Sequence, residues 1–282
     1  MEEASAEQWK LAAESYEKGS KATTAKPTAT LLERVNARLP FAEASGILDN
    51  GCGPGPYMAR LIETYGGDIP PSCALTCTDW APAMIEQVGH AKEKAVKLDP
   101  TSLWARVDAR VLDAMDLSAI PDASLSHVLA GWVYHMTSDP QKCLTETHRV
   151  LKPGGVLGVT SWKETQWLAA MAPIQKLDPS LRPPVGSPEF ASPTGLVKAL
   201  EAAGFAGVEL QEVPVDLPFQ SHALFTDVLM TKMPPLVALL ARFGPEQKDE
   251  LRHLMIEEMR ALCPEEPGAL KGVALVAVGR KE

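Results

Sequence analysis

The feature that most constrains the fold is a glycine-rich turn directly after a short apolar run, in the segment ILDNGCGPG at residues 47–55. Its three glycines are spaced two apart and lack a Cβ atom, so backbone N–H groups there can approach a bound ligand closely. Pro56 occupies the position that would complete the GxGxxG pattern of dinucleotide sites. The turn therefore favours a different nucleotide-like ligand, although taken alone it also fits an ordinary strand–turn–helix connection.

Composition narrows the class of protein. A chain of 282 residues, 45% of them hydrophobic, can form one large α/β domain or one domain with a small cap. The net charge of −9 disfavours a nucleic-acid partner, because such proteins usually present a basic face. No run approaches eighteen apolar residues and the N-terminus lacks a signal-peptide core, so no membrane partner is expected. Five cysteines without a zinc-like CxxC pair indicate reduced thiols, a cytoplasmic location and no metal site.

Strand-like and helical runs alternate between residues 46 and 162, which predicts βαβ units and a parallel sheet. The fold class is therefore α/β, a doubly wound, seven-stranded, mostly parallel sheet with N-terminal helices and a helical cap inserted before the last strand. Pro153-Gly154-Gly155 is expected to end one helix and turn the chain into the next strand. The predicted strands are 46–50, 73–79, 104–112, 125–130, 156–161, 208–215 and 271–280, and the predicted helices are 82–98, 139–151, 193–203 and two or three within 219–262.

Acidic residues stand at the expected carboxyl ends of two further strands, where ligands of open α/β sheets bind. Asp79 lies 24 residues after Gly55, and its carboxylate can accept hydrogen bonds from both hydroxyls of a ribose. The alternative for Asp79 is N-capping of the helix that starts near Pro82. Asp113 can accept a hydrogen bond from an adenine amino group, and Met115 offers an apolar contact, with a solvated turn as the alternative.

The segment RVLKPGG at residues 149–155 is the most specific string in the chain. Together with the glycine turn, Asp79 and the DAMDL stretch at 113–117, it resembles the class I, Rossmann-like S-adenosylmethionine (SAM)-dependent methyltransferases, in a small-molecule branch of fungal secondary metabolism. The resemblance covers about residues 40–215 and implies SAM as the cofactor, with only a structural role for RVLKPGG. The cofactor-site residues it implies are Tyr16, Asp49, Asn50, Gly51, Gly53, Asp79, Trp80, Met84, Asp113, Ala114, Met115, Gly131 and Trp132.

The same resemblance divides the chain into four expected parts. Residues 1–40 are expected to form a helical segment that closes over the cofactor, in which the hydroxyl of Tyr16 bonds the methionine carboxylate. The alternative for this segment is an amphipathic helix that packs on the domain. Residues 41–218 are the SAM-binding core, 219–265 a substrate cap and 266–282 the last strand of the core sheet. A set of Met and aromatic residues is expected either to line an apolar pocket for the acceptor or to pack in the cap's own core: Trp162, Trp167, Met171, Phe225, Met230, Met233 and Phe243.

The expected reaction is transfer of the sulfonium methyl group to an oxygen, nitrogen or sulfur atom of a small, largely apolar metabolite. Holding nucleophile, methyl and sulfur in line supplies much of the acceleration. A hydroxyl acceptor needs a base, and His135 is the leading candidate because imidazole titrates near neutrality. A packing role is the alternative for His135, and His222 on the cap is a second candidate base. A thiol or amine acceptor needs no base.

Two competing functions stay open at this point. A SAM-binding protein that does not methylate would carry the same cofactor motifs, because function depends on the acceptor site. An NAD(P)-dependent oxidoreductase is disfavoured by Pro56 and by the RVLKPGG segment. Methylation of RNA or protein has no motif or basic patch behind it, and the sequence does not indicate an oligomeric state.

Overall fold

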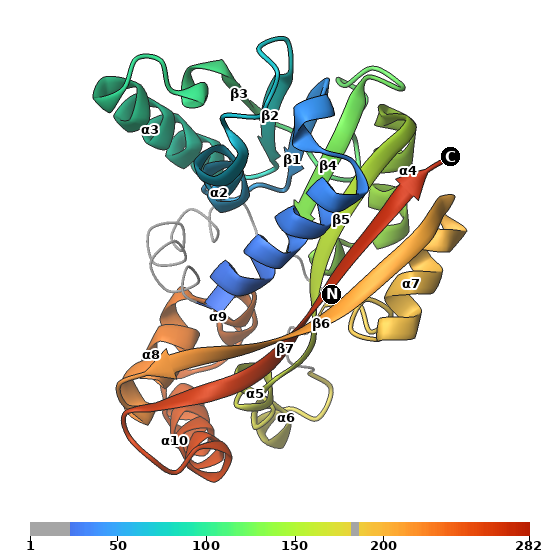
Figure 1. Ribbon diagram of the computed structural model, residues 1–282. Helices are drawn as coiled ribbons and strands as arrows, with labels where there is room; N and C mark the ends of the chain where they lie inside the picture. The colour runs from blue at the N-terminus through green and yellow to red at the C-terminus, as the bar shows by residue number, and fades with distance from the viewer. Residues whose placement is uncertain (1–22, 182–185) are drawn as a thin grey trace.

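The computed structural model describes residues 23–181 and 186–282. Its centre is one sheet in the order β3-β2-β1-β4-β5-β7-β6 (Figure 1). β1 pairs in parallel with β2 and β4, whereas β7 runs antiparallel to β5 and β6. The expected doubly wound, mostly parallel sheet of seven strands is therefore confirmed. The strands are β1 (Gly46–Asn50), β2 (Ala74–Asp79), β3 (Val107–Val111), β4 (Leu125–Gly131), β5 (Leu151–Thr165), β6 (Phe205–Phe219) and β7 (Gly268–Lys281).

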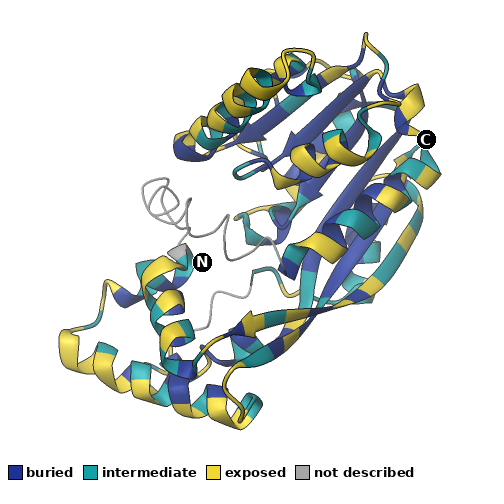
Figure 2. Ribbon diagram, turned by 60° about the vertical axis from the view of Figure 1, so that its left-hand side comes forward, coloured by how far each residue is buried: buried dark blue, intermediate teal, exposed yellow. Residues whose placement is uncertain are grey.

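The two faces of the sheet carry separate apolar cores, because successive side chains of a strand point to opposite faces. In β1, Ile47 joins the core under α2, α3 and the helix at residues 23–38, whereas Leu48 joins the core under α4 and α7. All five residues of β1 are buried, as in a strand covered on both faces, and Figure 2 shows the central sheet in the buried colour. These helices are α2 (Pro56–Tyr65), α3 (Pro82–Leu98), α4 (Pro140–Val150) and α7 (Pro193–Ala202).

Three helices inserted between β6 and β7 form what we call the helical cap: α8 (His222–Lys232), α9 (Pro234–Leu240) and α10 (Pro245–Leu262). Their buried Leu229, Leu236 and Leu251 form a cluster of their own, which Met171 and Ile174 join. Two short helices, α5 (Gln166–Ala169) and α6 (Ile174–Leu177), lie in the segment that supplies these last two residues. β6 and β7 stay paired as far as Phe219 and Gly268, and this long ribbon carries the chain from the sheet into the cap (Figure 1).

The start of β5 differs from the prediction. α4 ends at Val150, and the next residue, Leu151, already pairs with Leu125 of β4. Residues 152–155 then bulge out of the strand, with Gly154 at a φ of 81°, before pairing resumes at Val156. The expectation that the Pro-Gly-Gly segment ends the helix was wrong, because the strand begins before it.

β3 is shorter than predicted. The hydroxyl of Ser102 accepts a hydrogen bond from the N–H of Trp104, which starts a 3-10 helix, η2, at Leu103–Arg106. Trp104 is buried under that turn rather than in a strand. The extended backbone therefore begins only at Val107.

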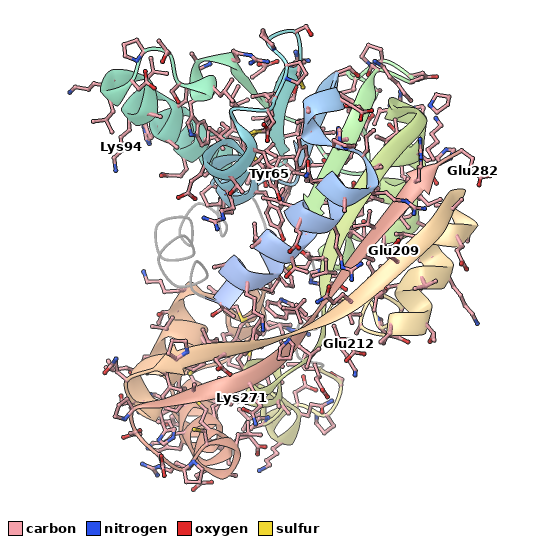
Figure 3. The ribbon with its side chains drawn as sticks, viewed as in Figure 1. Tyr65, Lys94, Glu209, Glu212, Lys271 and Glu282 are labelled. Atoms are coloured by element: carbon pink, nitrogen blue, oxygen red, sulfur yellow. The ribbon has the colours of Figure 1, made fainter. Side chains whose placement is uncertain are left out.

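The helix at residues 23–38 lies across one face of the sheet, in front of β5 in Figure 1. Leu31 and Val35 pack so closely on Gly158 of β5 that a Cβ there would come within 2.9 Å and 2.6 Å of them. Arg34 forms an ion pair with Glu209 of β6 at 2.9 Å, and Figure 3 labels Glu209 among the side chains. In residues 23–181 and 186–282, no helix is both long and apolar enough to cross a bilayer.

Candidate active site

The glycine turn adopts a backbone that only glycine adopts readily. Gly51, Gly53 and Gly55 have φ angles of 71°, 53° and 88°, in the left-handed region. A Cβ on Gly51 would lie 2.4 Å from the side chain of Val133, so packing also requires a glycine there. A Cβ on Gly53 would meet no atom within 4 Å. The middle of the turn therefore presents bare backbone to open space at the carboxyl end of β1.

Asp79 closes this turn onto β2. One carboxylate oxygen accepts the N–H of Gly53 at 2.9 Å, and the other accepts the N–H of Ala81 at 2.9 Å. Burial raises the pKa of Asp79, and the two N–H groups oppose that rise. α3 has Ala81 as its N-cap residue and no side-chain cap, so the N-capping alternative for Asp79 was wrong. Its carboxylate instead joins the glycine turn to the start of α3.

Asp49 lies beneath the turn with no exposed surface. One carboxylate oxygen accepts the N–H of Met58 at 3.2 Å, and the other has no hydrogen-bond partner. Burial, and to a smaller extent the charge of Asp79, raise the pKa of Asp49 to about 7, against the hydrogen bond from Met58. Asp49 therefore sits beside the site without reaching its surface.

Asn50 belongs to a buried network rather than to an open surface. Its side-chain amide donates to the hydroxyl of Tyr134 at 3.0 Å and accepts from the hydroxyl of Thr78 at 3.1 Å. Tyr134 in turn lies 2.5 Å from the hydroxyl of Thr147 on α4. This network joins β1, β2 and α4 directly under the site, and no sequence pattern signals it, because its members come from four separate segments.

The loop after β3 lies next to Asp79, since the N–H of Leu112 donates to the backbone oxygen of Asp79 at 3.1 Å. Asp113 is exposed, and its carboxylate accepts the N–H of Met115 at 2.8 Å. Ala114 is buried and Met115 half-buried beside it. On the other side of Asp79, Trp80 is 42% exposed, whereas Met84 is buried against Ala81. The ends of β1, β2 and β3 thus bring these predicted residues to one edge of the sheet.

The end of β4 carries an unusual backbone. Trp132 has a φ of 63°, a conformation that costs free energy for a bulky residue and that clusters at functional sites. A Cβ on the preceding Gly131 would lie 2.1 Å from the ring of Tyr57. The N–H of Trp132 donates to the hydroxyl of Thr160 at 3.1 Å, while its buried indole N–H has no partner.

Trp132 begins a row of three tryptophan rings in contact, and although each of them was a candidate from the sequence, the row itself was not predicted. Its ring stacks on Trp162 with centroids 4.0 Å apart, and Trp162 meets Trp167 edge-on at 4.9 Å. The row runs from β4 across β5 to α5 at the base of the cap. Met171, Phe225, Met230, Met233 and Phe243 instead pack in or against the cap's own core, which supports the packing alternative for them.

Neither candidate histidine is an exposed base. His135 is buried, its Nδ1 has no partner, and burial lowers its pKa to about 4. The expectation that it titrates near neutrality was wrong, because the desolvated ring disfavours the charged form. His222 is also buried: its Nε2 lies 2.7 Å from the backbone oxygen of Cys263, and its Nδ1 contacts the Glu266 carboxylate. It ties the start of α8 to the segment before β7.

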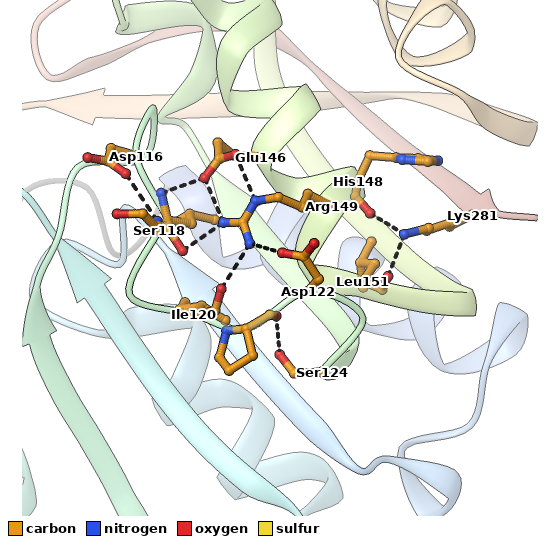
Figure 4. Close-up of polar contacts among 12 residues, drawn as sticks. Asp116, Ser118, Ile120, Asp122, Ser124, Glu146, His148, Arg149, Leu151 and Lys281 are labelled. Carbon is orange, nitrogen blue, oxygen red and sulfur yellow. Dashed lines mark hydrogen bonds and ion pairs between the residues drawn. The ribbon is translucent and has the colours of Figure 1, made fainter.

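The RVLKPGG segment contributes contacts to the architecture around the site. Its Arg149 donates to the backbone oxygens of Leu117 and Ile120 and to the carboxylates of Asp122 and Glu146 (Figure 4). These bonds fix the loop after β3 against α4, which is a structural task. Tyr16, the remaining predicted cofactor residue, lies outside the described residues.

Comparison with known proteins places the chain in a family. Residues 48–159 match the family model described as a methyltransferase domain. Methyltransferase ucsB from Acremonium sp is 45% identical over 274 residues, which cover 97% of this chain and 95% of that protein. Acetylaranotin bis-thiomethyltransferase from Aspergillus terreus is 26% identical, over 72% of this chain and 68% of that protein.

Solved structures support the fold. The YcgJ protein from Bacillus subtilis superposes with a TM-score of 0.55 at 19% identity, over 90% of this chain and 98% of its own. A SAM-dependent methyltransferase from Thermotoga maritima superposes with a TM-score of 0.52 at 17% identity, over 98% and 99%. Because a methyltransferase 45% identical to it matches nearly the whole chain, and because the sheet has this topology, the chain belongs to the class I, Rossmann-like family of SAM-dependent methyltransferases, in its small-molecule branch.

Proposed function

We propose that this chain binds SAM at the glycine turn and transfers its methyl group to an oxygen, nitrogen or sulfur atom of a small, largely apolar metabolite. The observation that carries the proposal is the closure of the turn onto Asp79. Gly53, which faces open space, donates its N–H to the carboxylate at the end of β2. A buried carboxylate beside bare backbone, at the switch point of an α/β sheet, is the arrangement that receives a ribose.

The residues around this turn fit the chemical groups of SAM. Each oxygen of Asp79 accepts one N–H and keeps a second lone pair for a ribose hydroxyl. Asp113 is exposed for the adenine amino group, and Trp80 offers an exposed aromatic surface, with the buried Met84 packed below it against Ala81. When bound, SAM supplies an electrophilic methyl group on a cationic sulfur. The protein's own contribution is to hold that group and the acceptor in line.

The helical cap is the acceptor-side part of this proposal. It begins at the end of β6, its connection to β7 returns to the sheet, and the tryptophan row leads to its base. We retain the division into a closing segment at 1–40, a SAM-binding core at 41–218, a substrate cap at 219–265 and a last core strand at 266–282. The described part of the first segment is the helix packed on β5.

Of the three possible acceptor atoms, sulfur fits the chemistry of this site best. His135, with a pKa of about 4, is a weak base, so an acceptor that ionises without help suits the site better than a hydroxyl. A thiol has an unperturbed pKa of roughly 8.5 and meets that need. One relative, at 26% identity, is by its name a bis-thiomethyltransferase.

Calorimetry with SAM and S-adenosylhomocysteine tests cofactor binding. Asp79→Asn keeps the side-chain size and removes the charge, and we expect affinity for both ligands to fall about tenfold to a hundredfold, the usual range for hydrogen bonds to a charged group. Asp108→Asn is the matched control, because Asp108 is exposed on the edge strand β3 and pairs with Arg110. No binding by folded wild-type protein, or equal affinities in both variants, contradicts the proposed site.

A turnover assay with thiol, amine and phenol acceptors separates the remaining functions. We expect S-adenosylhomocysteine to form with an apolar thiol and to form more slowly with a phenol. SAM binding without turnover on any extract or acceptor would favour the alternative, a SAM-binding protein that does not methylate.

A further inference from the structure

Asp49 is a carboxyl group in an environment that disfavours its charge. It lies in the central strand β1, has no exposed surface and receives one N–H, from Met58, for its two oxygens. A buried carboxylate is stable as an anion only when hydrogen bonds or a cation compensate for its lost hydration. A single N–H at 3.2 Å leaves most of that loss uncompensated.

The groups that face Asp49 do not supply a cation. Cys77 pairs with it from β2, Leu129 pairs with it from β4, Cys52 lies above it in the glycine turn, and Asp79 adds a second negative charge. From α2 the contact is the backbone N–H of Met58. No charged side chain that acts on Asp49 within the described residues is positive. Charge repulsion and burial therefore act in the same direction.

SAM differs from its product S-adenosylhomocysteine by one positive charge, on the sulfonium. We propose, resting on the proposed function above, that Asp49 is protonated in a large share of the free protein and releases its proton when the cationic methyl donor binds. The carboxylate under the turn then makes the site favour the donor over the neutral-sulfur product. Because Asp49 is fully buried, it acts through its charge and not through contact with the ligand.

Proton release from Asp49 makes the affinity for SAM depend on pH. With half of Asp49 protonated near pH 7, SAM binding releases about half a proton at pH 7, about nine-tenths at pH 6 and about one-tenth at pH 8. The affinity for SAM accordingly rises about tenfold between pH 6 and pH 8 through this group alone. Binding of S-adenosylhomocysteine releases a smaller fraction of a proton, because this ligand lacks the sulfonium charge.

Titration calorimetry in two buffers of different ionisation enthalpy counts the protons. The wild-type protein is compared with Asp49→Asn, which keeps the shape and cannot titrate, and with Asp108→Asn, an exposed acid on β3. Protons taken up or lost by the ligand itself cancel in this comparison. We expect the release at pH 7 to fall by about half a proton in Asp49→Asn and to stay unchanged in Asp108→Asn.

Should Asp49→Asn fail to fold, an infrared difference spectrum of the wild-type protein with and without SAM reports loss of a carboxyl proton without a variant. We expect the band of a protonated carboxyl group to disappear on SAM binding, and to do so less with S-adenosylhomocysteine. Binding of SAM with no such loss, or with equal proton release in wild type and Asp49→Asn, overturns this inference and leaves the proposed function standing. Absence of SAM binding by the folded protein overturns both.

Discussion

At the scale of single residues, burial decides which titratable groups carry charge. His135 has no partner on Nδ1 and a pKa near 4, so the folded protein holds it neutral, whereas the unfolded chain protonates it near 6.5. As pH falls below 6.5, the unfolded state takes up the proton first and the folded state loses stability. Above 6.5 the group has no effect.

This sign predicts the acid sensitivity of the protein. Between pH 7.5 and pH 5, His135 lowers the free energy of unfolding by about 2 kcal/mol, and His135→Asn removes that part of the loss. His90→Asn, on an exposed histidine of α3, should keep the wild-type dependence. Urea unfolding at the two pH values measures both variants. If wild type and His135→Asn lost the same free energy of unfolding, the ring of His135 would take up its proton as readily in the folded protein as in the unfolded chain.

The residues of the site show what a sequence can and cannot locate. Asp79 and the glycine turn were predictable, because each stands at a strand end and strand ends meet at one edge of a parallel sheet. The buried network of Asn50 was not, because its partners Tyr134 and Thr147 lie 84 and 97 positions away in the chain. The burial of His135 was not predictable either, because the residues that lie against it include Gly186 and Ser187, which are far along the chain.

At the scale of elements, the strands and most of the long helices were predictable, whereas their ends were predictable only in part. α3 was placed at its observed bounds, because Pro82 marks its first turn. β6 runs from Phe205 to Phe219 and so extends past both ends of the predicted strand 208–215, although it contains Pro214 and Pro218. Proline is tolerated there because β6 is an edge strand of the sheet. The pairing with β7, a tertiary contact, sets its length.

Two glycines give opposite predictions within these elements. Gly131→Ala pushes a Cβ to 2.1 Å from the ring of Tyr57, which is buried and held at Thr160, so we expect a loss of about 1–3 kcal/mol. Gly89 lies inside α3, where an added methyl group would meet no atom within 4 Å, so Gly89→Ala should gain about 0.5–1 kcal/mol. Urea unfolding of the two variants checks both signs. A neutral Gly131→Ala would mean that the ring of Tyr57 can move.

At the scale of the whole molecule, the described residues form a large apolar core on each face of the sheet and another in the cap. The cap was predictable as an insertion before the last strand, since its apolar helical residues at 219–262 lie between the predicted strands 208–215 and 271–280. Its attachment was not predictable. Met259 of α10 packs in the sheet core, and the ring of His222 binds the segment before β7, so the cap is fixed to the sheet at its root.

This arrangement predicts that damage to the cap core impairs binding of the methyl acceptor and leaves binding of SAM intact. Leu251→Ala removes a fully buried side chain of α10 and should cost about 2–5 kcal/mol, whereas Leu224→Ala, 62% exposed on α8, should cost little. Since the glycine turn and Asp79 lie at the ends of β1 and β2, outside the cap core, we expect Leu251→Ala to keep its affinity for SAM within about twofold, a difference of about 0.4 kcal/mol. Turnover, which needs the acceptor held by the cap, should fall. Thermal unfolding, calorimetry and a turnover assay on the same preparation test the separation, and a parallel loss of SAM affinity would mean that cap and sheet form one binding unit.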